Sequence, residues 1–150
     1  MSTTLQPTEP QNPQSTEPRP LTESQPRDLD DQGHPIVKGL FRPEEVAAIR
    51  DRFDDLGRKG EPVAEYWTPD TTSDNPMKRY PRVMHPHRWD ELSKRMMLKP
   101  EVGEVLRDLL REDVVACQAM YYFKPPGAKG QSLHQDNFYL SVKPGSCIAA

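Results

Sequence analysis

The sequence has little cysteine, no long apolar run and no excess of positive charge, and each shortage excludes a class of protein. Its two cysteines, Cys117 and Cys147, form no Cys-x-x-Cys pair, which excludes a disulfide scaffold and a cysteine-based zinc site and fits a reducing compartment. No apolar run approaches the roughly 20 residues of a membrane-spanning helix. The formal net charge is -3, so a basic surface for phosphate neutralisation is excluded. We therefore expect no nucleic-acid partner and no membrane partner, and we take the cytoplasm as the location.

Residues 1–35 differ in composition from the rest of the chain. They hold 7 of the 17 prolines, no aromatic residue and a net charge of -4. So little apolar surface cannot offset the entropy lost on ordering, and the segment is predicted to be a disordered, proline-rich acidic tail. Residues 36–150 are nearly neutral and have the length of one ordinary domain.

Three stretches carry the apolar spacing of amphipathic helices. The first opens at Pro43, a residue that suits the first helical position, and Glu44 and Glu45 follow at the positive end of the helix dipole. We expect Gly57 to end this helix. The second covers residues 89–98, and the third opens at Pro100. The apolar residues expected to pack are Val46, Ile49, Phe53, Leu56, Trp89, Leu92, Met96, Met97, Val102, Val105, Leu106, Leu109 and Leu110.

The second half of the chain changes to an extended pattern rich in β-branched and aromatic residues, so the fold class is α+β. A long loop is expected at 60–81. Because the last predicted strand has no partner to pair with, we expect the chain to be the front part of a longer protein. The predicted strands are residues 36–41, 114–123, 131–142 and 147–150.

The sharpest chemical feature is the triplet His134-Gln135-Asp136. On a strand, residues i and i+2 project from the same face, so His134 and Asp136 can aim an imidazole nitrogen and a carboxylate oxygen at one point. That is two thirds of the triad of two histidines and one carboxylate that holds Fe(II). Phe138 and Leu140 continue the same face as an apolar wall, with Asn137 and Tyr139 pointing away. A triplet of this kind also arises by chance, and the alternative is a His and an Asp on a solvated strand.

The surroundings of the triplet resemble the phytanoyl-CoA dioxygenase family of Fe(II)- and 2-oxoglutarate-dependent oxygenases. The residues that carry the resemblance are Met-Tyr-Tyr-Phe-Lys-Pro-Pro-Gly at 120–127, Leu-His-Gln-Asp-Asn-Phe-Tyr-Leu at 133–140 and Pro-Gly at 144–145, with weaker support from Val-Lys-Gly-Leu-Phe at 37–41 and Pro-Glu-Glu-Val at 43–46.

The resemblance implies roles for five residues. His134 and Asp136 match the first two iron ligands, and Gln135 and Met120 match positions lining the 2-oxoglutarate pocket. Arg82 lies near where the family can place a basic residue toward the co-substrate. An arginine that is simply exposed to solvent explains this position equally well. The implied fold has N-terminal helices packed on a double-stranded β-helix, a jelly-roll barrel that would be incomplete here. The family's second histidine ligand and its 2-oxoglutarate-binding arginine lie later in the sequence and have no counterpart in this chain.

Two functions remain open at this point. The first is a dioxygenase that uses Fe(II), 2-oxoglutarate and O2 to hydroxylate a C–H bond of a small molecule. The second is a non-catalytic fragment or binding subunit of a split or truncated oxygenase, pairing an open strand edge with another chain. His85 and His87 could replace the missing ligand and form a three-histidine zinc site with His134, or simply lie in an exposed loop before a helix. His34 is expected to be exposed to solvent.

Overall fold

The computed structural model describes residues 21–22, 24–126, 128, 130–132, 134–143 and 145–150. Helices and a small sheet make it α+β, as predicted, but the two strands of its sheet do not form a jelly-roll barrel within the described residues. The elements are α1 (Ser24–Gln32), α2 (Pro43–Lys59), α3 (Pro76–Arg79), β1 (Val83–Met84), the 3-10 helix η1 (Pro86–Arg88), α4 (Glu91–Met97), α5 (Pro100–Leu110), β2 (Met120–Tyr121) and α6 (Asp136–Leu140).

The long helix α2 begins as predicted and ends later than predicted. Glu45 closes its first turn, because the Glu45 carboxylate accepts a hydrogen bond of 2.8 Å from the backbone N–H of Arg42. The helix ends at Gly60, whose φ of 66° is left-handed. Gly57 lies inside the helix, and a Cβ there would come within 3.0 Å of the Phe123 ring. The glycine therefore makes room for a packed aromatic ring and does not end the helix.

The two predicted helices that follow are confirmed, with shorter bounds for the first. Asp90 caps α4, since its carboxylate accepts hydrogen bonds from the backbone N–H and the hydroxyl of Ser93 at 2.8 and 2.7 Å. The residues just before Asp90 form η1 and a turn, so α4 covers only part of 89–98. Helix α5 opens at Pro100 and buries Val102, Val105 and Leu109.

Most of the predicted strands are wrong. Strands β1 and β2 are antiparallel, with Val83 opposite Tyr121 and Met84 opposite Met120, so only two residues of the predicted strand 114–123 pair. The described residues of 36–41 and 147–150 contain no strand, and those of 131–142 contain α6 instead. Extended residues need a neighbouring strand to satisfy their backbone groups, and the described chain supplies none there. The predicted loop 60–81 holds the short helix α3 and an isolated bridge between Val63 and Trp67.

One apolar core joins α2 to the sheet. The Phe53 ring stacks on the Tyr121 ring with centroids 4.0 Å apart and planes 6° apart. The indole N–H of Trp67 donates to the carbonyl oxygen of Pro81 at 3.0 Å, which holds the loop before β1 against this core. The core residues are Phe53, Leu56, Trp67 and Val83, with Ile49, Val63, Trp89, Tyr121 and Phe123 partly buried around them.

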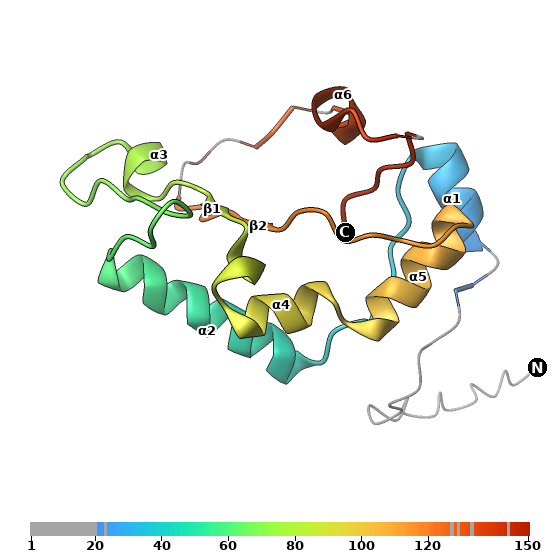
Figure 1. Ribbon diagram of the computed structural model, residues 1–150, viewed down its shortest axis with the longest axis horizontal. Coiled ribbons are helices and arrows are strands. Elements are labelled where there is room, and N and C mark those ends of the chain that lie inside the picture. Colours follow the sequence, from blue (N-terminus) through green and yellow to red (C-terminus); the bar gives the residue numbers. More distant parts are fainter. Residues whose placement is uncertain (1–20, 23, 127, 129, 133, 144) are drawn as a thin grey trace, which may run out of the picture.

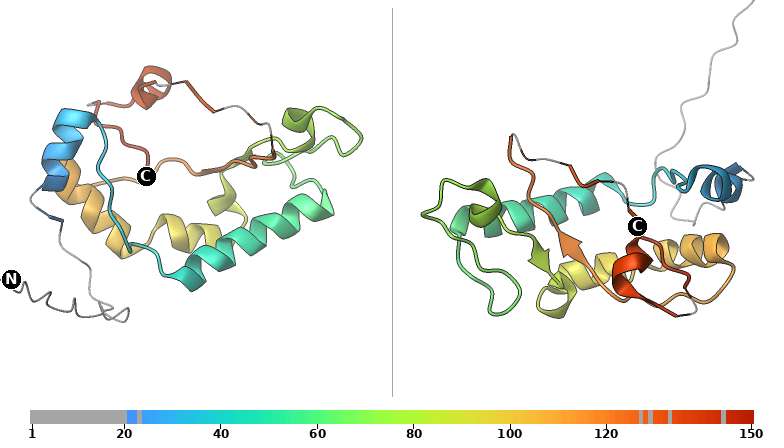
Figure 2. Two further views of the ribbon diagram at one scale, coloured as in Figure 1. Left: turned by 180° about the vertical axis from the view of Figure 1, so that it is seen from behind. Right: turned by 90° about the horizontal axis from the view of Figure 1, so that it is seen from above.

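Helix α1 lies beside α5 at the other end of the molecule (Figures 1 and 2). It falls within the tail predicted to be disordered, so that prediction is wrong for Ser24–Gln32, while residues 1–20 lie outside the described part. Figure 1 also shows α6 standing apart from the other helices. Within the described residues, no helix combines the length and the apolar character that crossing a membrane requires.

Candidate metal centre

The structure brings His134 and Asp136 together, although not on a strand. His134 Nε2 lies 3.1 Å from Asp136 Oδ1. Asp136 is the first residue of α6, and Gln135 has an extended backbone with φ of -101° and ψ of 121°. The chain thus turns from extended to helical between the two side chains, and they converge across that turn. The predicted convergence is present, but the predicted strand geometry behind it is wrong.

The other ring nitrogen of His134 is held by the backbone. Nδ1 lies 2.8 Å from the carbonyl oxygen of Ser132. A carbonyl oxygen only accepts, so Nδ1 must carry a proton for this hydrogen bond to form. A neutral ring then has its lone pair on Nε2, pointing at the Asp136 carboxylate. A ligating histidine commonly has this arrangement, with a carbonyl fixing the ring and leaving the second nitrogen for the metal.

The contact between Nε2 and Oδ1 requires a positive charge. A neutral imidazole nitrogen and an ionised carboxylate oxygen are both acceptors, so only a proton or a metal ion between them makes the approach favourable. Two ligands at adjacent corners of a metal centre, with bonds of about 2.1 Å meeting at a right angle, are about 3 Å apart. The observed 3.1 Å matches that separation. The two donors therefore fit a shared divalent cation.

The site is open to solvent. The side chains of His134 and Asp136 are 30% and 36% exposed, so a cation can reach them without rearrangement of the chain. The predicted apolar wall is wrong, because Phe138 and Leu140 lie on α6 and are 80% and 45% exposed. Tyr139 was expected to face away, but its ring lies 5.7 Å from the His134 ring in an edge-to-face arrangement.

Of the other three predicted site residues, Gln135 lies between the pair in the chain, whereas the contacts of Met120 are with other parts of the structure. Met120 lies in β2 opposite Met84, and its sulfur accepts a hydrogen bond from the Tyr122 hydroxyl at 3.4 Å. Arg82 comes just before β1 and is exposed, as is Gln135, the N-cap residue of α6. Their roles in binding 2-oxoglutarate therefore stay predictions.

A third protein ligand is not found within the described part of the chain. No group of three or more His, Cys, Asp or Glu side chains there is placed to hold one metal ion. The three-histidine alternative is thus not formed. His85 and His87 lie at η1 and are partly buried, which corrects the prediction of an exposed loop, whereas His34 is exposed as predicted. Cys117 and Cys147 are both free.

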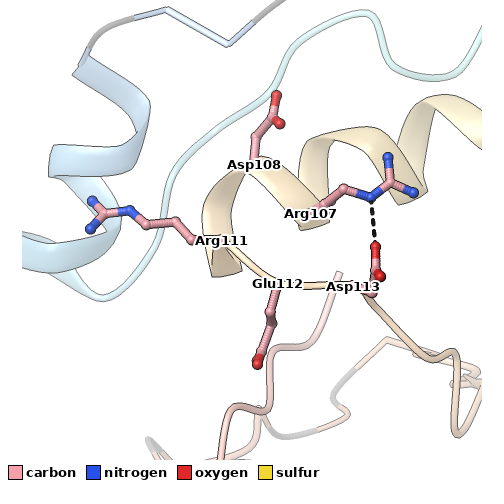
Figure 3. Close-up of a pocket in the computed structure, with 5 residues that line it drawn as sticks. All are labelled: Arg107, Asp108, Arg111, Glu112 and Asp113. Atoms are coloured by element: carbon pink, nitrogen blue, oxygen red, sulfur yellow. Dashed lines mark hydrogen bonds and ion pairs between the residues drawn. The ribbon is translucent and has the colours of Figure 1, made fainter.

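A shallow pocket at the end of α5 is lined by charged side chains only (Figure 3). Arg107 Nε donates to Asp113 Oδ1 at 3.3 Å across it, and Arg111 reaches toward Asp30 of α1 at 3.9 Å. None of the predicted site residues lines this pocket, which is formed by Arg107, Asp108, Arg111, Glu112 and Asp113. It has the ion-pair character of a solvated surface and supplies no histidine for a metal.

Sequence reasoning missed two groups at the His134 site. The Ser132 carbonyl fixes the His134 ring, and Tyr139 packs against that ring. The carbonyl carries no sequence signal, because every residue has one. The contact of Tyr139 with His134 forms because the chain turns into α6 directly after Gln135, and only a helical reading of 136–140 could have found it.

The comparisons with known proteins agree with one another. The family model for phytanoyl-CoA dioxygenase (PhyH) matches residues 29–150. The protein "Phytanoyl-CoA dioxygenase 1" of Oryza sativa subsp. japonica is 26% identical over 159 residues. That match covers 85% of this chain and 57% of the rice protein, so the chain spans little more than half the length of this relative. No solved structure matches.

Proposed function

The chain belongs to the phytanoyl-CoA dioxygenase family, and from that premise we propose that it is part of an Fe(II)- and 2-oxoglutarate-dependent oxygenase acting on a small molecule. The observation that supports the proposal most is the 3.1 Å approach of His134 Nε2 to Asp136 Oδ1, a contact that a proton or a bound metal ion between the two atoms makes favourable. A donor set of one imidazole and one carboxylate on one side of a metal suits ferrous iron and leaves the other positions open.

In this proposal each residue has a defined task. His134 and Asp136 bind the iron, and the Ser132 carbonyl holds the His134 ring with its lone pair on Nε2. Met120 and Gln135 line the 2-oxoglutarate pocket, and Arg82 faces the co-substrate with its positive charge. Iron bound here would supply the activation of O2 that couples 2-oxoglutarate oxidation to hydroxylation of a C–H bond. Metal binding competes with protons on both ligands, so it weakens in acid.

The remaining parts of the proposed site come from polypeptide that this chain does not contain. The chain has no histidine after His134 and spans 57% of the rice relative. We propose that the second histidine ligand, the arginine for the far carboxylate of 2-oxoglutarate and the rest of a jelly-roll barrel belong to that further polypeptide. We place the complete protein in the cytoplasm.

A second candidate function is a binding subunit without catalysis of its own. It is favoured by the exposure of Phe138 and Tyr139, at 80% and 70%, on a helix that stands apart from the others (Figure 1). Exposed aromatic side chains of this kind mark surfaces that contact another polypeptide. In this reading His134 and Asp136 complete a metal site only after a partner chain binds.

Turnover of 2-oxoglutarate distinguishes the candidates. The test uses the longer protein in which this chain is joined to the polypeptide that supplies the second histidine and the arginine. That protein is incubated with Fe(II), O2 and 2-oxoglutarate, and succinate is measured alongside its His134→Ala variant and the control His34→Ala. The oxygenase proposal predicts succinate above the metal-only background in the wild-type protein and in His34→Ala, and background in His134→Ala. Equal succinate from wild type and His134→Ala removes the catalytic role of this site. Background succinate from a chain that still binds Fe(II) through His134 favours the binding subunit.

A further inference from the structure

His85 and His87 leave two buried polar atoms without a partner. Their rings lie with centroids 5.6 Å apart and planes 88° apart. Nδ1 of each ring is buried and makes no hydrogen bond, although both residues are partly exposed. A buried nitrogen without a partner has lost its hydrogen bonds to water and has gained none within the protein. Such atoms are therefore uncommon in folded proteins and often mark a missing water or ion.

The backbone holds the two histidines firmly in place. The N–H of His85 donates to the carbonyl oxygen of Ala119 at 2.9 Å, which anchors the segment beside β2. The N–H of Arg88 donates to the carbonyl oxygen of His85 at 3.0 Å, and Pro86 between the histidines is buried. The pair is therefore presented by an ordered turn against the core.

We infer that His85 and His87 form a second metal site, separate from the one proposed at His134, that takes a late first-row divalent cation such as Zn2+. Two imidazoles that share one cation through bonds of 2.0–2.1 Å have ring centroids about 5 to 5.5 Å apart. The observed centroid separation of 5.6 Å is close to this range, so the two rings are near enough to share a cation once both Nδ1 atoms face it. A cation bound by both Nδ1 atoms would give each of them the partner it lacks.

The ligand set selects the kind of cation. Imidazole nitrogen suits zinc, copper and nickel, whereas magnesium and calcium prefer oxygen ligands. Within the described residues no third side chain joins the two histidines to complete a larger cluster. Water or a small carboxylate ligand would fill the remaining positions, so the site is an exchangeable one of modest affinity.

Nuclear magnetic resonance on the 150-residue chain tests this site. The nitrogen-15-labelled protein is titrated with Zn2+, with Mg2+ as the comparison ion, and the histidine ring nitrogens are observed directly. We expect Zn2+ to shift Nδ1 of both His85 and His87, and Mg2+ to leave them unchanged. The indole N–H of Trp67, bonded to Pro81, serves as an internal reference.

Two variants keep the test independent of folding. Asparagine tolerates the positive φ of 46° at position 85, so His85→Asn and His87→Gln remove one ligand each with little strain, and circular dichroism confirms the helices. Each is expected to weaken Zn2+ binding by about tenfold or more, while His34→Ala and His134→Ala retain it. Unchanged Zn2+ affinity in His85→Asn and His87→Gln, binding through Nε2 alone, or no shift at a large excess of Zn2+ would overturn the inference.

Discussion

Arg52 Nε donates to Asp90 Oδ1 at 2.7 Å, and this ion pair ties α2 to the first turn of α4. The Asp90 side chain is only 9% exposed. Burial alone would raise the pKa of its carboxyl, but hydrogen bonds from Arg52 and Ser93 outweigh it and hold the pKa below its usual range. The carboxylate thus acts both as a helix cap and as the partner of a cation on a neighbouring helix.

Replacing Asp90 with alanine should therefore destabilise the fold. The change removes the cap of α4 and leaves Arg52 without its partner, and we expect a loss of about 2 kcal/mol or more in the free energy of unfolding. Urea denaturation measures this loss. The matched control is Asp51→Ala, which breaks an exposed ion pair with Arg50 on α2 and should change the free energy of unfolding much less than Asp90→Ala does. Equal losses in the two variants would show that the Asp90 contacts contribute no more to stability than an exposed ion pair does.

The ion pair between Glu45 and Lys99 makes the stability of the fold depend on pH. Hydrogen bonds from Lys99 at 2.7 and 2.9 Å and from the Arg42 backbone lower the pKa of Glu45 from 4.5 to about 2. A lowered pKa contributes stability that is fully present above pH 4.5 and is lost as the pH falls toward 2. The difference in unfolding free energy between wild type and Glu45→Gln should therefore shrink over that window. Denaturation curves at stepwise pH check it, and a difference that stays constant from pH 6 to pH 2 would contradict the assignment.

The stacking of Phe53 on Tyr121 predicts where the core is least tolerant. Phe53 is 1% exposed, whereas Val46 on the same helix is 50% exposed. Phe53→Ala should cost about 3 to 5 kcal/mol, because it removes buried apolar contacts and leaves a cavity. Val46→Ala should stay within about 1 kcal/mol. Thermal and urea unfolding of both variants measure these losses. A loss for Phe53→Ala as small as the one for Val46→Ala would show that the centre of the core lies elsewhere.

The sequence predicted the helices well because their signals are local. The apolar spacing after Pro43 and after Pro100 located α2 and α5, since a helix satisfies its backbone groups within its own segment. The sequence predicted the end of α2 at Gly57, but the helix continues to Lys59. A glycine that makes room for Phe123 looks the same in sequence as one that ends a helix. Separating the two requires knowledge of a contact between residues far apart in the chain.

The strands could not be predicted in the same way. Residues 131–142 have an extended composition, but their pairing depends on neighbours that the described chain lacks, and α6 forms there instead. The pairing of His134 with Asp136 was nevertheless predicted from their spacing, because side chains two positions apart can converge through more than one backbone path. The contact of His134 with Tyr139 follows from the helix and could not be seen from a strand pattern.

The affinity of the chain for Fe(II) tests the central claim most directly. Anaerobic calorimetry with 2-oxoglutarate present is carried out on a chain that carries His85→Asn and His87→Gln, so that the second site does not contribute. We predict one Fe(II) bound, with the affinity reduced about tenfold or more by either His134→Ala or Asp136→Asn. Fe(II) affinity that is unchanged by both substitutions would contradict the account.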